Sequence, residues 1–227
     1  LDPYPPGPFL VREHSGLLEY LEVWSQSEVT AVLAQGETKL QNAACEPHVV
    51  GLARMLNAMG AQISGVGANM LNITGVSELG GTEHTIGSDL LEIGGYIVLA
   101  AITRSALTIS GANPDEMRII RSTYRKLGIQ YDLQNDLVVI PAGQILRVQP
   151  DFAGDIPKID DGTWPNFPTD LMSIVIVAAT QAEGTVLFFE KMYDGRMFFV
   201  DLAGQKDSRY PTFGILFYFP CLIQAEM

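Results

Sequence analysis

Residues 88–112 read SDLLEIGGYIVLAAITRSALTISGA, an apolar helix with a polar start, a tight turn and a short strand. The same order recurs from Ser25 through VTAVLAQ to GETKLQNA, and from Thr169 through MSIVIVAATQAEG to TVLFFE. A unit that repeats at a period of roughly 65 to 80 residues indicates a fold assembled from equivalent supersecondary units. Each helix begins with a Ser or Thr cap, and carboxylates stand at the positive end of its dipole. We therefore predict a mixed α/β fold.

A helix that lies on a sheet is expected after the first strand. The stretch HVVGLARMLNAMGAQI places apolar residues at helical spacing, stops at Gly60 and resumes as an alternating strand. A comparable helix opens at Asn113-Pro114-Asp115 and ends at Gly128. Its inward-facing residues are Met117, Ile120, Tyr124 and Leu127. After it, IQYDL pairs through Gln134-Asn135 with LVVIP as a hairpin.

The three units are expected to pack around a shared centre, because lone helices and hairpins cannot bury their apolar faces unaided. The almost wholly apolar run SIVIVAA is predicted to be a helix buried on all sides. Residues 141–167 are rich in Pro and Gly and are interpreted as a long crossing loop. Residues 202–227 contain the nearly uncharged stretch PTFGILFYFPCLI, which we expect to be exposed.

Composition excludes several classes of function. The net charge is −12 with only 14 Lys and Arg, so a nucleic-acid surface is not expected. No apolar run reaches the length that spans a bilayer, and the start has no signal-peptide pattern, which favours the cytoplasm. Cys45 and Cys221 are too few for a disulfide framework and are expected to be reduced thiols. His48 and His84 have no partners at metal spacing, so no metal site is predicted.

Several specific strings resemble the enolpyruvyl transferase family, in its branch that acts on a sugar nucleotide. They include NAACEP, MGAQISG and FPTDLMS, and the resemblance extends over about residues 28–201. It implies an inside-out α/β barrel of repeated βαβαββ units, present here incompletely. On this reading residues 1–20 are a Pro-rich leader and 21–87 the last unit of one domain. A hinge near Gly87 then leads to the first units of the next domain at 88–201, and 202–227 form an unmatched tail.

The resemblance also implies a reaction and a site. The family transfers the enolpyruvyl group of phosphoenolpyruvate to the 3-hydroxyl of UDP-N-acetylglucosamine, without a metal or organic cofactor. Asp170 matches the carboxylate that contacts the sugar hydroxyl and is the candidate base. Arg196 matches an arginine that holds the anionic cosubstrate, since a planar fork suits carboxylate or phosphate. Met192 matches a backbone contact to the nucleotide sugar.

The same residues have plainer interpretations when spacing alone is considered. Asp170 is then a carboxylate that favours a helix dipole, and Arg196 is a solvated surface charge. Asp89 and Glu92 are interpreted as cap and hinge residues. The run KIDDG is expected to be an exposed acidic loop rather than a cation site. GVGANM is interpreted as a turn between a helix and a strand.

Two other functions stay open at this point. The family's Lys-Asn pair, its mobile catalytic loop and its last arginine fall outside the matched region, so we expect a fragment that lacks turnover. A non-catalytic remnant that binds a nucleotide sugar is therefore one alternative. The other is an enzyme like 5-enolpyruvylshikimate-3-phosphate synthase, which NAACEP and FPTDLMS disfavour. The oligomeric state is not predicted.

Overall fold

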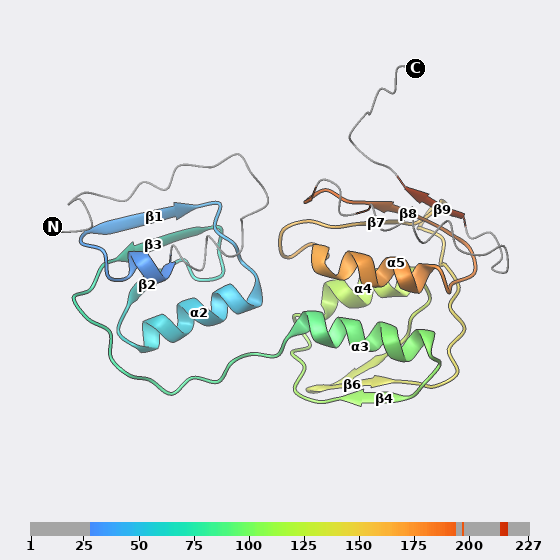
Figure 1. Cartoon of the computed structure of the whole chain (residues 1–227), viewed down its shortest axis with the longest axis horizontal. Helices are drawn as coiled ribbons and strands as arrows, with labels where there is room; N and C mark the ends of the chain where they lie inside the picture. The colour runs from blue at the N-terminus through green and yellow to red at the C-terminus, as the bar shows by residue number, and fades with distance from the viewer. Residues whose placement is uncertain (1–27, 194–196, 198–213, 218–227) are drawn as a thin grey trace, which may run out of the picture. The chain divides into compact units, whose positions relative to one another are not determined.

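The computed structural model describes residues 28–193, Met197 and 214–217 (Figure 1). Residues 28–31 are helical, and the helices with both ends described are α2 (Pro47–Ala58), α3 (Leu90–Ile102), α4 (Arg118–Lys126) and α5 (Met172–Ala179), the last preceded by the 3-10 turn η2 (Thr169–Leu171). The strands are β1 (Glu37–Gln41), β2 (Gln62–Ser64), β3 (Met70–Thr74), β4 (Leu107–Ile109), β5 (Asp132–Gln134), β6 (Leu137–Ile140), β7 (Lys158–Asp160), β8 (Thr185–Phe189) and β9 (Gly214–Phe217). Within the described residues they form three sheets, ordered β1-β3-β2, β4-β6-β5 and β7-β8-β9.

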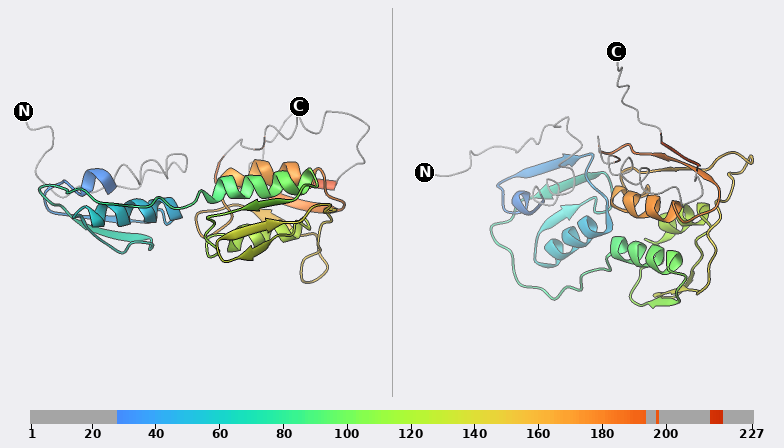
Figure 2. Two further views of the ribbon diagram at one scale, coloured as in Figure 1. Left: turned by 90° about the horizontal axis from the view of Figure 1, so that it is seen from below. Right: turned by 45° about the vertical axis from the view of Figure 1, so that its right-hand side comes forward.

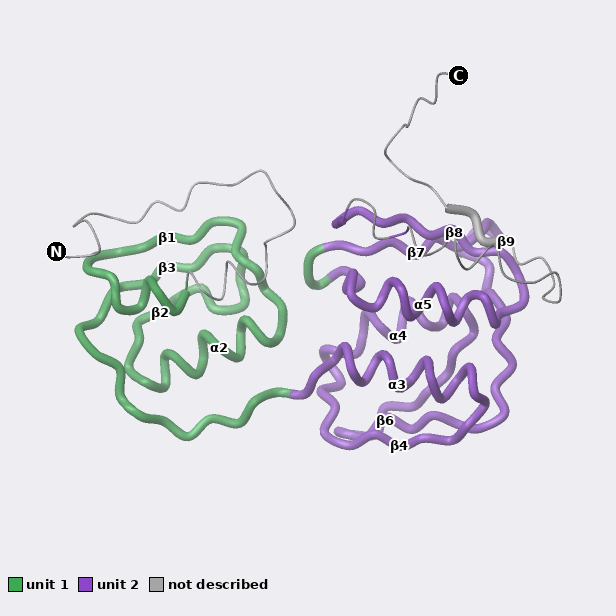
Figure 3. The backbone as a smooth tube through the Cα atoms, in the orientation of Figure 1, with its two compact units in different colours: residues 1–87, 163–165 green, residues 88–162, 166–227 purple. Residues whose placement is uncertain are grey.

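The chain divides into two compact units, drawn in different colours in Figure 3. Unit 1 comprises residues 1–87 with 163–165, and unit 2 comprises 88–162 with 166–227. The main division falls between Gly87 and Ser88, and the hinge and domain roles expected for these ranges stay predictions.

Unit 1 is a helix on an antiparallel sheet. The α2 side chains Ala53 and Leu56 pack in one buried cluster with Leu40, Ile63 and Ile73 of the three strands. Asn57 fixes the neighbouring strand, because its amide accepts from Ile63 N and donates to Ile63 O, both at 2.8 Å. The helix ends before Gly60, whose φ of 108° only glycine adopts readily. The predicted helix, turn and strand are confirmed here.

Unit 2 places its helices inside and its sheets outside. Figure 1 shows α3, α4 and α5 between the sheet that contains β4 and β6 and the sheet that contains β7, β8 and β9; Figure 2 gives two further views. Helix on helix and helix on sheet are the two packings that bury an apolar helix such as α3. Both occur, since α3 packs against α5 and also against β4 and β6. The described sheets are separate and do not close into a barrel, so the closed form stays a prediction.

Tyr124 lies at the centre of unit 2. Its side chain is fully buried, its hydroxyl donates to Gly94 O of α3 at 3.0 Å, and its ring meets Phe167 edge-on at 6.2 Å. Helix α3 approaches closely at this point, because a Cβ on Gly94 would stand 2.8 Å from Leu171 Cδ1. Tyr124 therefore joins α3, α4 and the segment that leads into η2.

Local predictions in unit 2 are largely confirmed. Asp89 caps α3, since its carboxylate accepts from Leu91 N at 2.8 Å and Glu92 N at 3.1 Å. The predicted hairpin forms between β5 and β6, and Asn135 in its turn has a φ of 57°. Four residues were predicted to face inward from the helix that opens at Asn113, which corresponds to α4. All four are buried, namely Met117, Ile120, Tyr124 and Leu127.

Three expectations are corrected. Residues 141–167 are not simply a loop, because they contain β7, which pairs in parallel with β8. The SIVIVAA helix is not buried on all sides, since Val177 is 46% exposed. In the tail, Gly214–Phe217 form β9 and pair in parallel with β8, so this segment belongs to a sheet rather than standing apart from the fold. Strand pairing over such sequence distances leaves no local signal.

Candidate functional site: a carboxyl pair beside the predicted sugar contacts

The site lies where β7 and β8 end. These strands are parallel, and Asp160 pairs in register with Phe189. The next residue of each strand, Asp161 and Glu190, therefore leaves the sheet at the same edge. In open α/β sheets the carboxyl ends of parallel strands are the edge at which ligands bind. An isolated parallel bridge between Asp161 and Phe167 brings the following segment, η2, to this edge as well.

Glu190 joins two segments by hydrogen bonds. Its Oε1 accepts from Met192 N at 3.0 Å and from Tyr193 N at 3.1 Å, which closes the turn after β8. The same oxygen lies 3.3 Å from Thr169 Oγ1, so the hydroxyl of η2 donates to it. Asp161 Oδ1 accepts from Lys191 N at 2.7 Å. The backbone N–H groups of residues 191–193 are thus held by the side chains of Asp161 and Glu190.

These two acidic groups, which we call the carboxyl pair, are buried. Asp161 is 1% exposed and Glu190 is 7% exposed. Burial, followed by the hydrogen bond and the charge of Asp161, raises the pKa of Glu190 to about 7, although the Met192 and Tyr193 N–H groups lower it. Asp161 Oδ2 is buried with no hydrogen-bond donor among the described residues. A protonated carboxyl group has an O–H that can donate to such an unpaired acceptor oxygen.

The neighbouring Asp160 has a different environment. Its carboxylate forms ion pairs with Lys158 Nζ at 3.1 Å and with Lys191 Nζ. Burial acts to raise the pKa of Asp160, but the hydrogen bonds and charges of Lys191 and Lys158 outweigh it and lower the pKa. Asp160 is therefore ionised at neutral pH and is the ion-pair partner of both Lys158 and Lys191.

The structure brings two predicted site residues to this edge. Asp170 is exposed in η2 directly after Thr169, and Met192 is half-buried in the turn after β8. Glu190 connects their segments through Thr169 Oγ1 and Met192 N. Arg196, the third predicted residue, lies outside the described residues. The helix start differs slightly from expectation, because η2 precedes α5 and the Thr169 hydroxyl is directed to Glu190.

The carboxyl pair itself was missed from the sequence. KIDDG was expected to be an exposed acidic loop, and this is wrong: Lys158–Asp160 form β7 and Asp161 is buried. The available signal was the alternation of Lys158, Ile159 and Asp160, which is typical of a strand. Lone acidic residues are rarely buried, so the pattern favoured the loop.

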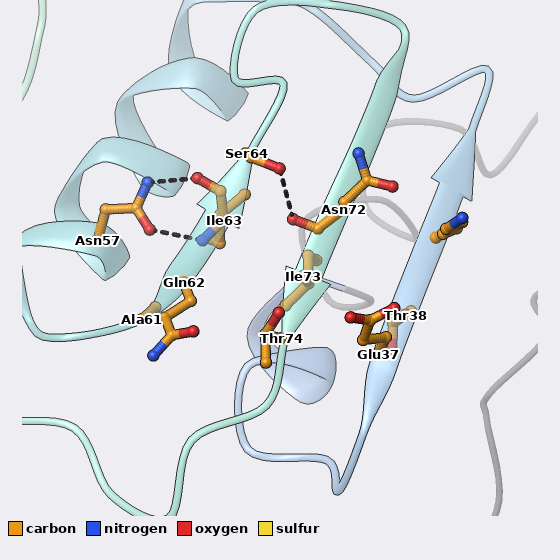
Figure 4. A pocket seen from close by; sticks show the side chains of 11 residues that line it. Glu37, Thr38, Asn57, Ala61, Gln62, Ile63, Ser64, Asn72, Ile73 and Thr74 are labelled. Carbon is orange, nitrogen blue, oxygen red and sulfur yellow. Dashed lines mark hydrogen bonds between the residues drawn. The ribbon is translucent and has the colours of Figure 1, made fainter.

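A hollow of unit 1 lies elsewhere on the chain. It has a volume of about 700 Å³ and is lined by residues of β1, β2 and β3 together with Asn57 (Figure 4). Its ionisable lining residues are Glu37 and Lys39. No predicted site residue lines it, and we assign it no role.

Metal and membrane features are absent from the part of the chain that the structure describes. No three His, Cys, Asp or Glu side chains there are grouped to hold a metal ion. No helix in these ranges has the length and apolarity needed to cross a bilayer. Cys45 is a free thiol, and burial together with the charge of Glu46 raises its pKa. Cys221 lies outside the described residues.

Comparison with known families identifies the family to which the chain belongs. The family model described as EPSP synthase (3-phosphoshikimate 1-carboxyvinyltransferase) matches residues 29–201. The chain belongs to this enolpyruvyl transferase family. The matched range agrees with the region over which the resemblance was recognised.

Curated relatives are similar to this enolpyruvyl transferase chain in sequence, and one solved structure is similar to it in fold. UDP-N-acetylglucosamine 1-carboxyvinyltransferases of Borreliella burgdorferi and Treponema denticola are 55% and 54% identical to it over 173 residues, which are 76% of the chain. The chain spans about 40% of the length of these relatives. The enolpyruvyl transferase NikO from Streptomyces tendae shares its fold, with a TM-score of 0.67 and 19% identity over 83% of this chain and 43% of that one.

Proposed function

We propose that this chain contributes a substrate-binding segment to a cytoplasmic UDP-N-acetylglucosamine 1-carboxyvinyltransferase of peptidoglycan synthesis. The observation that carries the proposal is the hydrogen-bonded link from the η2 segment through Glu190 to Met192. It joins the two segments that the resemblance assigns to the sugar nucleotide. The identity of 55% to a relative of that name supports this substrate over shikimate 3-phosphate.

Each residue has a chemical task in the proposed reaction. Asp170 accepts the proton of the 3-hydroxyl as its oxygen bonds to C2 of phosphoenolpyruvate; C3 takes up a proton in this addition and gives one up when the C2–O bond to phosphate breaks. The exposure of Asp170 leaves the carboxylate accessible to a substrate. The N–H of Met192 already donates to Glu190, so the Met192 carbonyl oxygen is the backbone group that accepts a hydrogen bond from the nucleotide sugar. Arg196 holds the carboxylate or phosphate of phosphoenolpyruvate. No cofactor is proposed.

Titration calorimetry with UDP-N-acetylglucosamine tests the proposal. Asp170→Ala should weaken binding by about 1 to 3 kcal/mol, because a charged hydrogen bond is lost. Asp136→Ala is the matched control, since Asp136 is also an exposed carboxylate of unit 2 but lies in the β5–β6 turn. Equal affinity for the Asp170 variant and the unaltered chain, or equal loss in both variants, would refute the assignment.

Binding without turnover is the second candidate function, because Asp170 and Met192, the two predicted site residues that the structure describes, are both assigned to the nucleotide sugar. A phosphate-release assay with both substrates separates the two. Turnover on the order of 1 per second is ordinary for an enzyme. Release near that rate supports transferase activity of this chain, whereas affinity without release supports the binding role.

A further inference from the structure

We propose that Asp161 and Glu190 share one proton, and that this bridged pair is a positioning device that holds the Met192 turn beside the Asp170 turn. Asp161 and Glu190 are then positioning residues rather than catalytic ones. The part of the inference that concerns substrate rests on the proposed function. The part that concerns the shared proton is independent of that function and rests on the burial and hydrogen bonds of the pair.

The first argument is that, among the residues that the structure describes, no Lys or Arg forms an ion pair with either member of the carboxyl pair. Two adjacent buried carboxylates cannot both stay ionised without compensation. Lys158 of β7 and Lys191, which follows β8, direct their ammonium groups to Asp160. The described part of α5 carries no ionisable residue, and β9 is described by its backbone only. Among the described residues, the other ionisable groups on the neighbouring segments are Asp170, Tyr193 and Lys126, and the Lys126 ammonium donates to Lys158 O at 2.6 Å.

The second argument is the pattern of hydrogen bonds around the pair. Asp161 Oδ1 and Glu190 Oε1 are occupied by backbone donors of residues 191–193. Asp161 Oδ2 is buried and has no donor among the described residues. One proton on Glu190 supplies that donor and removes the repulsion between the two groups. Burial and the Asp161 charge raise the pKa of Glu190 to about 7, in agreement with a proton held up to neutral pH.

The consequence is a pH-dependent turn. Below the pair's transition the bridge keeps the Lys191, Met192 and Tyr193 N–H groups in place. Above it two carboxylates face one another, and the turn that carries Met192 loses its fixed geometry. Affinity for the nucleotide sugar should then fall by up to about tenfold for each pH unit above the transition, the limit for loss of one proton.

The test uses the full chain and two readouts. The first is the backbone amide NMR shifts of residues 191–193 from pH 5 to pH 9 without ligand. We expect one common transition near neutral pH, absent in Glu190→Gln and in Asp161→Asn. Each variant keeps the acceptor oxygen and adds an amide donor that imitates the bridging proton. Asp160→Asn is the control and should retain the transition.

The second readout is calorimetric affinity for UDP-N-acetylglucosamine over the same pH range. The unaltered chain should weaken above the transition, whereas Glu190→Gln and Asp161→Asn should keep its low-pH affinity throughout. Glu190→Ala should bind weakly at every pH, because it removes the acceptor of Met192 N.

The two readouts test the shared proton and the positioning role separately. Amide shifts that show no neutral transition, or one that persists in both amide variants, overturn the shared proton. A transition that behaves as expected in a chain with no affinity for the nucleotide sugar upholds the shared proton and refutes the proposed function. A transition with pH-independent affinity overturns the positioning role.

Discussion

Removal of the Tyr124 hydroxyl tests the packing of unit 2 at its centre. Tyr124→Phe deletes one buried hydrogen bond, to Gly94 O at 3.0 Å, and leaves the ring against Phe167. The Gly94 carbonyl lies within α3 and keeps the N–H four residues later as its helical partner. The loss should therefore be that of an ordinary hydrogen bond, about 1 kcal/mol.

Tyr124→Ala is the matched larger change. It removes the ring as well as the hydroxyl from a fully buried position. Deletion of a buried aromatic side chain costs about 3 to 5 kcal/mol, because packing is lost and a cavity remains. The pair of variants separates the hydrogen bond from the packing of the ring.

Thermal and urea unfolding followed by circular dichroism measure both changes. A loss of 1 kcal/mol lowers the melting temperature of a domain of this size by roughly 2 to 4 °C. Tyr124→Phe should fall in that range and Tyr124→Ala several times further. Equal destabilisation by the two variants, or a loss below about 1.5 kcal/mol in Tyr124→Ala, would show that Tyr124 does not pack between the helices as described.

Three further predictions concern stability. The free energy of unfolding should decrease as pH rises from about 4.5 to about 7, because burial raises the pKa of Glu28 and of Glu190 to about 7. Over this interval the folded chain holds protons that the unfolded chain releases. Urea midpoints that rise over the same interval would contradict this prediction. Asp89→Ala should lower the free energy of unfolding by about 1 kcal/mol through loss of the α3 cap, whereas Asp89→Asn should retain most of the cap's stabilisation. Equal melting temperatures of the alanine variant and the unaltered chain would exclude the cap's contribution. A chain that ends at Asp201 lacks β9 and exposes the edge of β8, so its melting temperature should fall by at least 2 to 4 °C, about 1 kcal/mol; an unchanged value would show that β9 does not stabilise the sheet.

The sequence determined the local elements and the family. Asp89 was recognisable as a cap, and Gly128 and Asn135 as turn residues, because each of these roles depends on a few adjacent residues. The spacing of Ile120 and Tyr124 predicted the buried face of α4, since helical periodicity is visible within one segment. Strings such as FPTDLMS were specific enough to identify the enolpyruvyl transferase family before any geometry was known.

The proximity and burial of the carboxyl pair are visible only in the tertiary structure. Asp161 and Glu190 are far apart in sequence and meet because β7 and β8 pair in parallel. The polar run KIDDG indicates solvent exposure when read alone, whereas its actual burial depends on which strand lies beside it. The pairing of β9 with β8 was hidden for the same reason. Partner strands, and the acid–base state of groups buried between them, are set by long-range contacts that no local pattern encodes.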